Sequence, residues 1–301
     1  MKFPKVSLIV PAYNEEKEIK NLLSSIMKLN YPKNKLETIV IDDKSTDRTA
    51  EVVKEFPVKL LKGGHKGVGR ARNLGIKKSK GEIVLFIDAD QILDKNYVKE
   101  IVKSFKDKRV GAASDTELLL NKDSLIAKLL FLRGKLAENQ SNLLLFRACR
   151  KKIIEEVGYI NPKYGMYDDW DLAKRVSKKY KIVKVNKAKI WHKYPANISE
   201  VYRQARWGGR STIFLFPDYK IRAIKFFLFA TLCAGLPVYI MFLFLSSSFR
   251  VLGTIGLILF LIFELLRSVK MFKITGWKEA FLTHFSIVFI IFCFLPEYLK
   301  V

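Results

Sequence analysis

Short apolar runs alternate with polar, helix-like stretches along the first hundred residues of the chain. Residues 19–26 carry apolar side chains at helical spacing, and Tyr31-Pro32 follows them as a helix breaker. Four apolar runs are predicted as strands, at 6–10, 37–41, 58–61 and 82–87. Strands that alternate with helices favour an α/β fold with a mostly parallel sheet.

Polar residues directly follow three of these predicted strands. They are Tyr13-Asn14-Glu15, Asp42-Asp43 and Asp88-Ala89-Asp90. Because such sheets bind ligands at the carboxyl ends of their strands, we expect these residues to share one crevice. The carboxylates of Asp88 and Asp90 suit a hard divalent cation that also holds substrate phosphates. Asp42-Asp43 is also compatible with a simple helix cap and turn.

Two common nucleotide-binding classes do not fit the chain. The glycine-rich loop at 63–69 lacks the Lys-Ser/Thr ending of a P-loop, and GxGxxG is absent. We therefore discount an ATPase and a dinucleotide-dependent dehydrogenase. The cysteines are scattered without a CxxC, which argues against a disulfide scaffold and a cysteine zinc site. They are Cys149, Cys233 and Cys293.

An acidic cluster surrounds Trp170 at the start of a predicted helix. Asp168, Asp169 and Asp171 lie within four residues of each other. Acidic residues in a first turn often only complement the helix dipole. Three aspartates around one tryptophan are more than the helix dipole requires, so one of these aspartates is a candidate general base.

A basic segment ends in Arg203-Gln204-Ala205-Arg206-Trp207. One interpretation is a helix lying on a membrane surface with an interfacial tryptophan. Another is a phosphate clamp formed by Arg206 beside a sugar-stacking Trp207. Both interpretations can hold together.

Three apolar runs follow this segment. Residues 226–245 are 20 consecutive residues without a formal charge, which is the length of a membrane-spanning helix. The runs at 251–266 and 280–295 are 16 residues each, so a re-entrant or buried pair is the alternative. We predict three membrane helices.

The chain is strongly basic, with 54 Lys+Arg against 29 Asp+Glu and a net charge of +25. This excess suits nucleic acid, an anionic membrane or phosphate groups. Residues 223–301 contain only 7 basic and 3 acidic residues, so the charge belongs to the preceding part. No nucleic-acid-binding module is recognisable, and we expect no nucleic-acid partner. Basic flanks around the apolar runs predict a multi-pass cell-membrane protein with its N-terminal part in the cytoplasm and without a cleaved signal peptide.

The ordered motifs resemble the inverting GT-A glycosyltransferases of family two. The motifs are VSLIVPAYNEE, ETIVIDDKSTDRT, GxxxARNLGI, KGEIVLFIDAD, YDDWDLAKR and RQARW. The resemblance implies a Rossmann-like GT-A catalytic domain over residues 1–195. We expect an amphipathic interfacial segment at 196–222 and the membrane region at 223–301. The RQARW sequence resembles the (Q/R)xxRW element of membrane-embedded polysaccharide synthases.

The resemblance also implies a nucleotide-sugar site. Pro11, Ala12, Tyr13 and Glu15 match the lining of its nucleoside pocket, with Tyr13 stacked on the base. Further residues of that site are Asp43, which would hydrogen-bond the nucleobase, Arg72 on the same wall, and Asp88, Ala89 and Asp90 at the donor diphosphate. Asp88 and Asp90 would hold Mg²⁺ or Mn²⁺, with Asp90 as the direct ligand.

Family positions likewise imply the catalytic and acceptor groups. Asp169 matches the catalytic base, and Asp168 stands where glutamate is usual. Asp168, Arg203, Arg206 and Trp207 are assigned to acceptor and phosphate groups. The implied reaction moves a sugar from a nucleotide-diphosphate donor, preferably a UDP-sugar, to a hydroxyl of a saccharide or lipid-linked acceptor.

Alternatives remain open for the activity. The dolichol-phosphate sugar synthases, which use GDP- or UDP-sugars, resemble the N-terminal half but typically lack RxxRW. Three helices alone make a narrow channel for a polymer, and a homo-oligomer of several chains would make a wider one. Membrane lipid is a further expected partner. A membrane-tethered sugar-binding module without activity is a distant alternative.

Overall fold

The computed structural model describes residues 3–140 and 143–204 of the 301. The described residues fall into two units, the first made of residues 3–121, 138–140 and 143–194, and the second of residues 122–137 and 195–204. The predicted membrane region at 223–301 lies outside the described residues, and so do Arg206 and Trp207. Within the described ranges, no helix combines the length and the apolar character needed to cross a membrane.

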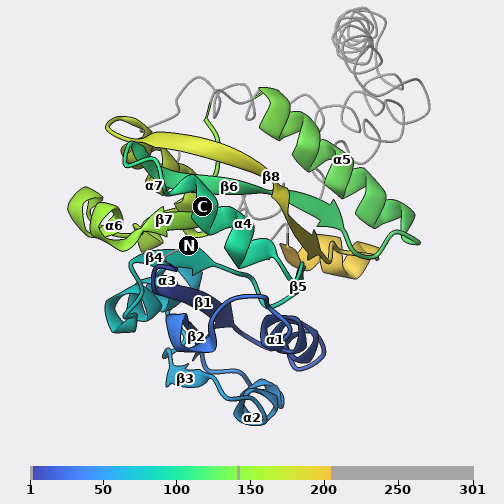
Figure 1. The fold of residues 1–301 in the computed structure, drawn as a ribbon. Helices are drawn as coiled ribbons and strands as arrows, with labels where there is room; N and C mark the ends of the chain where they lie inside the picture. The colour runs from blue at the N-terminus through green and yellow to red at the C-terminus, as the bar shows by residue number, and fades with distance from the viewer. Residues whose placement is uncertain (1–2, 141–142, 205–301) are drawn as a thin grey trace, which may run out of the picture. The chain divides into compact units, whose positions relative to one another are not determined.

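An eight-stranded mixed sheet forms the first unit, in the order β3-β2-β1-β4-β7-β6-β8-β5 (Figure 1). The strands are β1 (Val6–Ala12), β2 (Leu36–Asp42), β3 (Lys59–Lys62), β4 (Ile83–Phe86), β5 (Gln91–Leu93), β6 (Val110–Leu119), β7 (Ala148–Arg150) and β8 (Lys181–His192). Strands β1 to β4 pair in parallel, as does β6 with β8. The short β7 and β5 pair antiparallel with their neighbours, so the sheet is mixed: its first half is parallel, as expected, and its second half combines parallel and antiparallel pairs.

Helices connect these strands along the chain. They are α1 (Ile19–Met27), α2 (Thr49–Lys54), α3 (Val68–Lys78), α4 (Tyr97–Ser104), α5 (Leu125–Gln140), α6 (Lys151–Val157) and α7 (Asp168–Ser177). Short 3₁₀ turns lie at Lys33–Lys35 and Pro162–Tyr167. All four predicted strands are present, and the predicted helix at 19–26 corresponds to α1.

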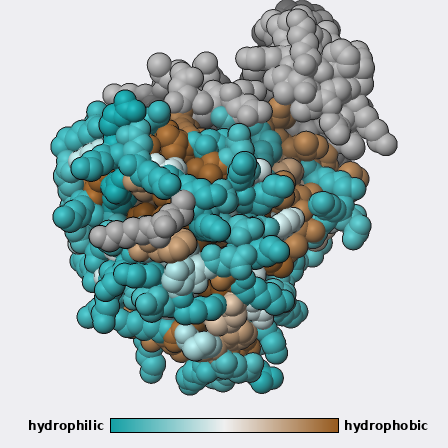
Figure 2. Space-filling view, viewed as in Figure 1, coloured by the Kyte–Doolittle hydropathy of each residue, from teal (hydrophilic) through white to brown (hydrophobic). Residues whose placement is uncertain are grey.

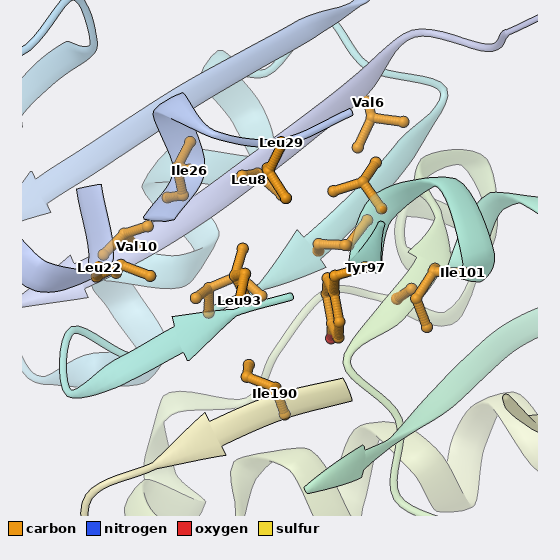
Figure 3. Close-up of a cluster of buried hydrophobic side chains, with 14 of the residues drawn as sticks. Val6, Leu8, Val10, Leu22, Ile26, Leu29, Leu93, Tyr97, Ile101 and Ile190 are labelled. Atoms are coloured by element: carbon orange, nitrogen blue, oxygen red, sulfur yellow. The ribbon is translucent and has the colours of Figure 1, made fainter. Parts of the chain in front are cut away.

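Two apolar clusters cover the two faces of the sheet, because side chains alternate along each strand. Leu8 and Val10 of β1 pack with α1 and α4 in one cluster (Figure 3). Ile9 of the same strand packs with α3, α6 and α7 in the other. Both faces of β1 are therefore buried, as is usual for parallel strands between two helix layers.

Polar residues form most of the surface that surrounds these cores. On the face seen in Figure 2, hydrophilic residues cover most of the described surface. This distribution is the one expected of a chain segment that is rich in lysine and glutamate but has a buried, aliphatic sheet.

Candidate active site

Parallel pairing brings three strand ends to one edge of the sheet. The register places Ala12 of β1 opposite Asp42 of β2, and the Asp43 amide donates to the Ala12 carbonyl at 2.8 Å. β4 lies on the other side of β1 and ends shortly before Asp88. The polar residues that follow these strands therefore start from adjacent positions, at the edge where α/β sheets bind ligands.

Asp43 organises the glycine-rich loop that follows β3. Its two carboxylate oxygens accept hydrogen bonds from the backbone amides of Lys66 (3.1 Å) and Gly67 (2.8 Å). A Cβ atom on Gly63 would lie 2.6 Å from Asp43 Oδ1, so the close approach of this loop requires glycine. A hollow of about 200 Å³ lies beside it, lined by Asp43, Gly63, Lys66, Arg70, Ala71 and Leu74.

Tyr13 borders this part of the site and is 45% exposed. Its ring centroid lies 4.9 Å from that of His65, at an interplanar angle of 49°. Pro11 and Ala12 are the last residues of β1 and carry Tyr13 to the sheet edge. An exposed aromatic ring at this edge has the form needed to stack on a planar base.

Glu15 lies in a strongly negative environment. Its backbone amide donates to Thr49 Oγ1 at 2.8 Å, which ties it to the start of α2. The pKa of the Glu15 carboxyl is raised to about 8. Burial is the largest cause, and the nearby negative charges of Asp90 and Asp88 act in the same direction. A bound cation would relieve this repulsion between carboxylates.

Arg72 of α3 joins two acidic motifs that are far apart in sequence. Its Nη2 lies 2.8 Å from Asp88 Oδ1, and its Nη1 lies 2.7 Å from Asp168 Oδ1. Arg72 was expected on the nucleoside wall, whereas the structure places its guanidinium between the two aspartates. This bridge positions the residues after β4 relative to the first turn of α7.

Asp88 is held by donors on both carboxylate oxygens. Besides Arg72, Arg147 Nη1 lies 3.2 Å from its Oδ2, and Gln91 Nε2 donates to the same atom at 3.2 Å. Burial opposes ionisation, but the two guanidinium groups prevail and lower the pKa of Asp88 to about 2. Asp88 is thus a fixed anion at neutral pH.

Asp90 differs because one of its oxygens has no partner. Its Oδ2 lies 3.3 Å from His192 Nε2, while its Oδ1 is buried without a hydrogen bond. Among the described residues, no group of three or more His, Cys, Asp or Glu is arranged to hold a metal ion by itself. The unpartnered Oδ1 fits a cation that also takes ligands from a substrate, and it makes Asp90 a better direct ligand than Asp88.

The acidic cluster at 168–171 divides into three environments. Asp168 is 1% exposed, and burial raises its pKa to about 6 in spite of Arg72. Asp169 Oδ1 accepts the Trp170 amide at 2.7 Å, and burial also raises the Asp169 pKa, against the opposing charge of Arg72. Asp171 instead pairs with Arg175 at 2.6 Å, whose guanidinium also donates to carbonyls of the preceding loop. Asp169 therefore has the raised basicity that a general base needs, and Asp171 supports the loop.

The sequence patterns do not predict that charged groups lie behind the two aspartates. They are Asp115 and Glu117 of β6, Arg147 before β7, and His192 at the end of β8. Burial opposes the His192 charge, but Asp90 and Glu117 raise the pKa of its imidazole to about 10. The available signal was the interruption of apolar runs by single charges, as in VGAASDTELL.

The basic pentapeptide is described only in part. Arg203 is exposed and belongs to the second unit, while Arg206 and Trp207 lie outside the described residues. Their assignment to acceptor and phosphate groups stays a prediction.

Comparisons with known proteins agree with this geometry. Residues 7–121 match the family described as glycosyl transferase family 2. A poly(ribitol-phosphate) β-N-acetylglucosaminyltransferase of Staphylococcus aureus, TarS, is 41% identical over 102 residues, which are 32% of this chain and 18% of that protein. A poly-β-1,6-N-acetyl-D-glucosamine synthase of Staphylococcus epidermidis is 27% identical over 271 residues, or 80% of this chain and 64% of that protein.

Solved structures of glycosyltransferases share the fold. A crystal structure of S. aureus TarS 1–349 in complex with UDP has a TM-score of 0.52 and 24% identity, covering 69% of this chain and 65% of that one. The mannosyltransferase PcManGT from Pyrobaculum calidifontis, in complex with GDP-Man and Mn²⁺, has a TM-score of 0.60 and 20% identity, covering 94% and 86%.

The chain therefore shares the fold of these glycosyltransferases. More specifically, residues 7–121 match the family described as glycosyl transferase family 2, and the relatives above that are similar to this chain are named as a glycosyltransferase and a polysaccharide synthase. The chain spans about a fifth to two thirds of the length of these curated relatives.

Proposed function

We propose that the protein is a metal-dependent inverting glycosyltransferase that uses a nucleotide-diphosphate sugar. The observation that carries the proposal is the Arg72 bridge, which joins Asp88 to Asp168 at 2.8 and 2.7 Å. Through one guanidinium, the bridge ties the proposed diphosphate-binding motif to Asp168, the neighbour in sequence of the proposed base Asp169. A sugar bound between them would meet both groups.

Asp169 takes the proton of the acceptor hydroxyl in this proposal. The acceptor oxygen then forms a bond to the anomeric carbon as the bond from that carbon to the diphosphate oxygen breaks. The nucleoside diphosphate leaves with the electron pair of that bond, and the configuration at the anomeric carbon inverts. Burial of Asp169 favours proton uptake, because it disfavours the charged carboxylate.

Asp90 would hold the Mg²⁺ or Mn²⁺, and Asp88 would support it through its fixed negative charge. When bound, the cation would stabilise the negative charge that builds on the departing diphosphate. Asp43 and Tyr13 would bind the base and ribose at the other end of the donor. Pro11, Ala12 and Glu15 complete this lining.

A UDP-sugar is the donor that we propose, with UDP-N-acetylglucosamine tested first. The names of the two relatives above describe an N-acetylglucosaminyltransferase and a poly-N-acetylglucosamine synthase. The acceptor would be a hydroxyl of a saccharide or of a lipid-linked saccharide. We place the protein in the cell membrane through residues 226–245 and the following apolar runs, with the catalytic domain in the cytoplasm.

The test is a donor screen on the full chain in detergent, with Mg²⁺, Mn²⁺ or EDTA. Release of UDP from UDP-N-acetylglucosamine while a saccharide accumulates would support the proposal. Release that requires a polyprenyl phosphate, from a UDP- or GDP-sugar, would instead identify a polyprenyl-phosphate sugar synthase. Nucleotide binding without release from any donor would indicate an inactive binding module.

A further inference from the structure

Charged side chains link Asp88 to Asp90 in a ring that the backbone between these two aspartates closes. Arg147 Nη1 contacts Asp88 Oδ2 at 3.2 Å, and Arg147 Nη2 contacts Glu117 Oε2 at 2.6 Å. The other oxygen of Glu117 lies 3.2 Å from His192 Nδ1, and His192 Nε2 lies 3.3 Å from Asp90 Oδ2. Glu117 therefore contacts both cations behind the Asp88-Ala89-Asp90 turn.

Glu117 is itself fixed by its surroundings. Its side chain is 15% exposed, and Tyr194 Oη donates to its Oε1 at 2.7 Å. Arg147 Nε lies 3.4 Å from Asp115, which accepts the hydroxyl of Tyr97 at 2.6 Å. Tyr97 is fully buried in the apolar cluster of Figure 3. The ring is thus anchored to the hydrophobic core.

We propose that Glu117 is a positioning residue, which holds Arg147 and His192 against Asp88 and Asp90 and so sets the position of the two aspartates. The inference rests on the proposed function for its effect on donor binding, but its effect on the turn does not depend on that function. Buried charges keep such positions only while their counter-charges remain. Outer partners of ligating carboxylates usually matter for metal affinity in the same way.

Glu117→Gln is the direct test, because the amide keeps the shape of the side chain. An amide oxygen can accept from one of the two cations, but its NH₂ group then faces the other donor. Tyr194→Phe removes only one hydrogen bond to Glu117 and is the milder variant. Glu156→Gln is the matched control. Glu156 lies on α6 and forms an ion pair at the surface with Lys179, at 3.0 Å.

The first measurement is amide hydrogen exchange of the segment 87–93 in the full chain without metal or nucleotide. We expect exchange about tenfold faster in Glu117→Gln, an intermediate increase in Tyr194→Phe and no change in Glu156→Gln. Exchange in the strands β1 and β2 should stay at the parental rate, which a general loss of stability would not allow. Parental exchange at 87–93 in Glu117→Gln would overturn the proposal.

The second measurement is UDP binding by calorimetry, with Mn²⁺ and with EDTA. We expect Glu117→Gln to weaken UDP binding about tenfold in Mn²⁺ and to leave binding in EDTA unchanged. Equal weakening in both solutions would contradict a role at the aspartates. If the parental protein binds no UDP in either solution, the proposed function fails, while the exchange measurement still decides the role of Glu117.

Discussion

At the scale of single residues, the site separates two functions that carboxylates can have. Arg72 and Arg147 keep Asp88 ionised, with a pKa of about 2, although burial opposes its charge. Burial dominates at Asp169 and raises its pKa. A fixed anion suits electrostatic support of a cation, and a carboxylate that takes up protons more readily suits general base chemistry. The assignments therefore follow from the environments of the residues as well as from their motifs.

Asp169→Asn tests the base. We expect sugar transfer to fall by about a hundredfold or more, because the amide cannot take the acceptor proton. UDP affinity should stay within twofold of the parental value by calorimetry, since the proposal gives Asp169 no contact with the nucleotide. Asp171→Asn serves as a comparison. Asp171 pairs with Arg175, so this variant should lower the stability of the fold and leave the rate of sugar transfer unchanged. Normal turnover by Asp169→Asn would contradict the assignment.

Asp90→Asn tests the cation ligand. The variant keeps the contact surface but loses the charge of the unpartnered Oδ1. We expect Mn²⁺-dependent UDP binding to weaken by about ten- to a hundredfold, as measured by titration of Mn²⁺ at fixed UDP. Asp123→Asn, which changes an exposed aspartate in the same way, should leave that titration unchanged. Equal Mn²⁺ dependence in both variants would remove Asp90 from the cation site.

At the scale of the elements, the first half of the sheet was predictable and the second half was not. The first four strands, β1 to β4, are short apolar runs that follow one another along the chain with helices between them, and they pair in parallel. β6 carries Asp115 and Glu117, and β8 carries lysines along its exposed side, so neither is a continuous apolar run. The ring around Glu117 escaped prediction for the same reason, because it depends on pairings between β6, β7 and β8.

Gly75→Ala tests how α3, the helix that carries Arg72 into the site, packs on the sheet. An added Cβ would lie 2.5 Å from Ile9 and 2.9 Å from Ile41 in the sheet below. Helix and sheet would have to separate, and we expect a loss of about 1–3 kcal/mol in the free energy of unfolding. Chemical denaturation measures it, with the exposed Lys78→Ala of the same helix as the control. A parental stability for Gly75→Ala would show that α3 can shift without cost.

Asp47 links the start of α2 to the loop after β1. Its carboxylate accepts the Thr49 amide at 3.0 Å and the Glu16 amide at 3.2 Å. Burial opposes its charge, but these hydrogen bonds and one from the Thr49 hydroxyl together prevail and lower its pKa. Its contribution is therefore complete above the unfolded-state pKa, about 4, and is lost as the pH falls through the lower, folded-state value. Asp47→Asn should lower the melting temperature at pH 7 and have a smaller effect near pH 3. An equal effect at both pH values would contradict this account.

At the scale of the whole molecule, the sequence divides into a charged part that contains the candidate site and an apolar part. The family match covers residues 7–121, and the site continues to Tyr194 in the same compact unit. The proposed membrane helices lie in residues 223–301, where basic residues flank the apolar runs. A cytoplasmic catalytic domain would meet nucleotide sugars where they are made and deliver product at the membrane surface. The proposed function therefore requires the N-terminal end of the first of these runs to face the cytoplasm.

Cysteine labelling tests that orientation in cells. The native background is low, because Cys149 is fully buried and burial raises the pKa of its thiol, while the other two cysteines lie in the apolar runs. Glu51→Cys lies on the exposed side of α2, and Ser247→Cys lies between the first two apolar runs. We expect a membrane-impermeant maleimide to label Ser247→Cys in intact cells and to label Glu51→Cys only after the membrane is opened. The opposite pattern would place the catalytic unit outside, where the positive flanks of residues 220–225 and 267–278 disfavour it.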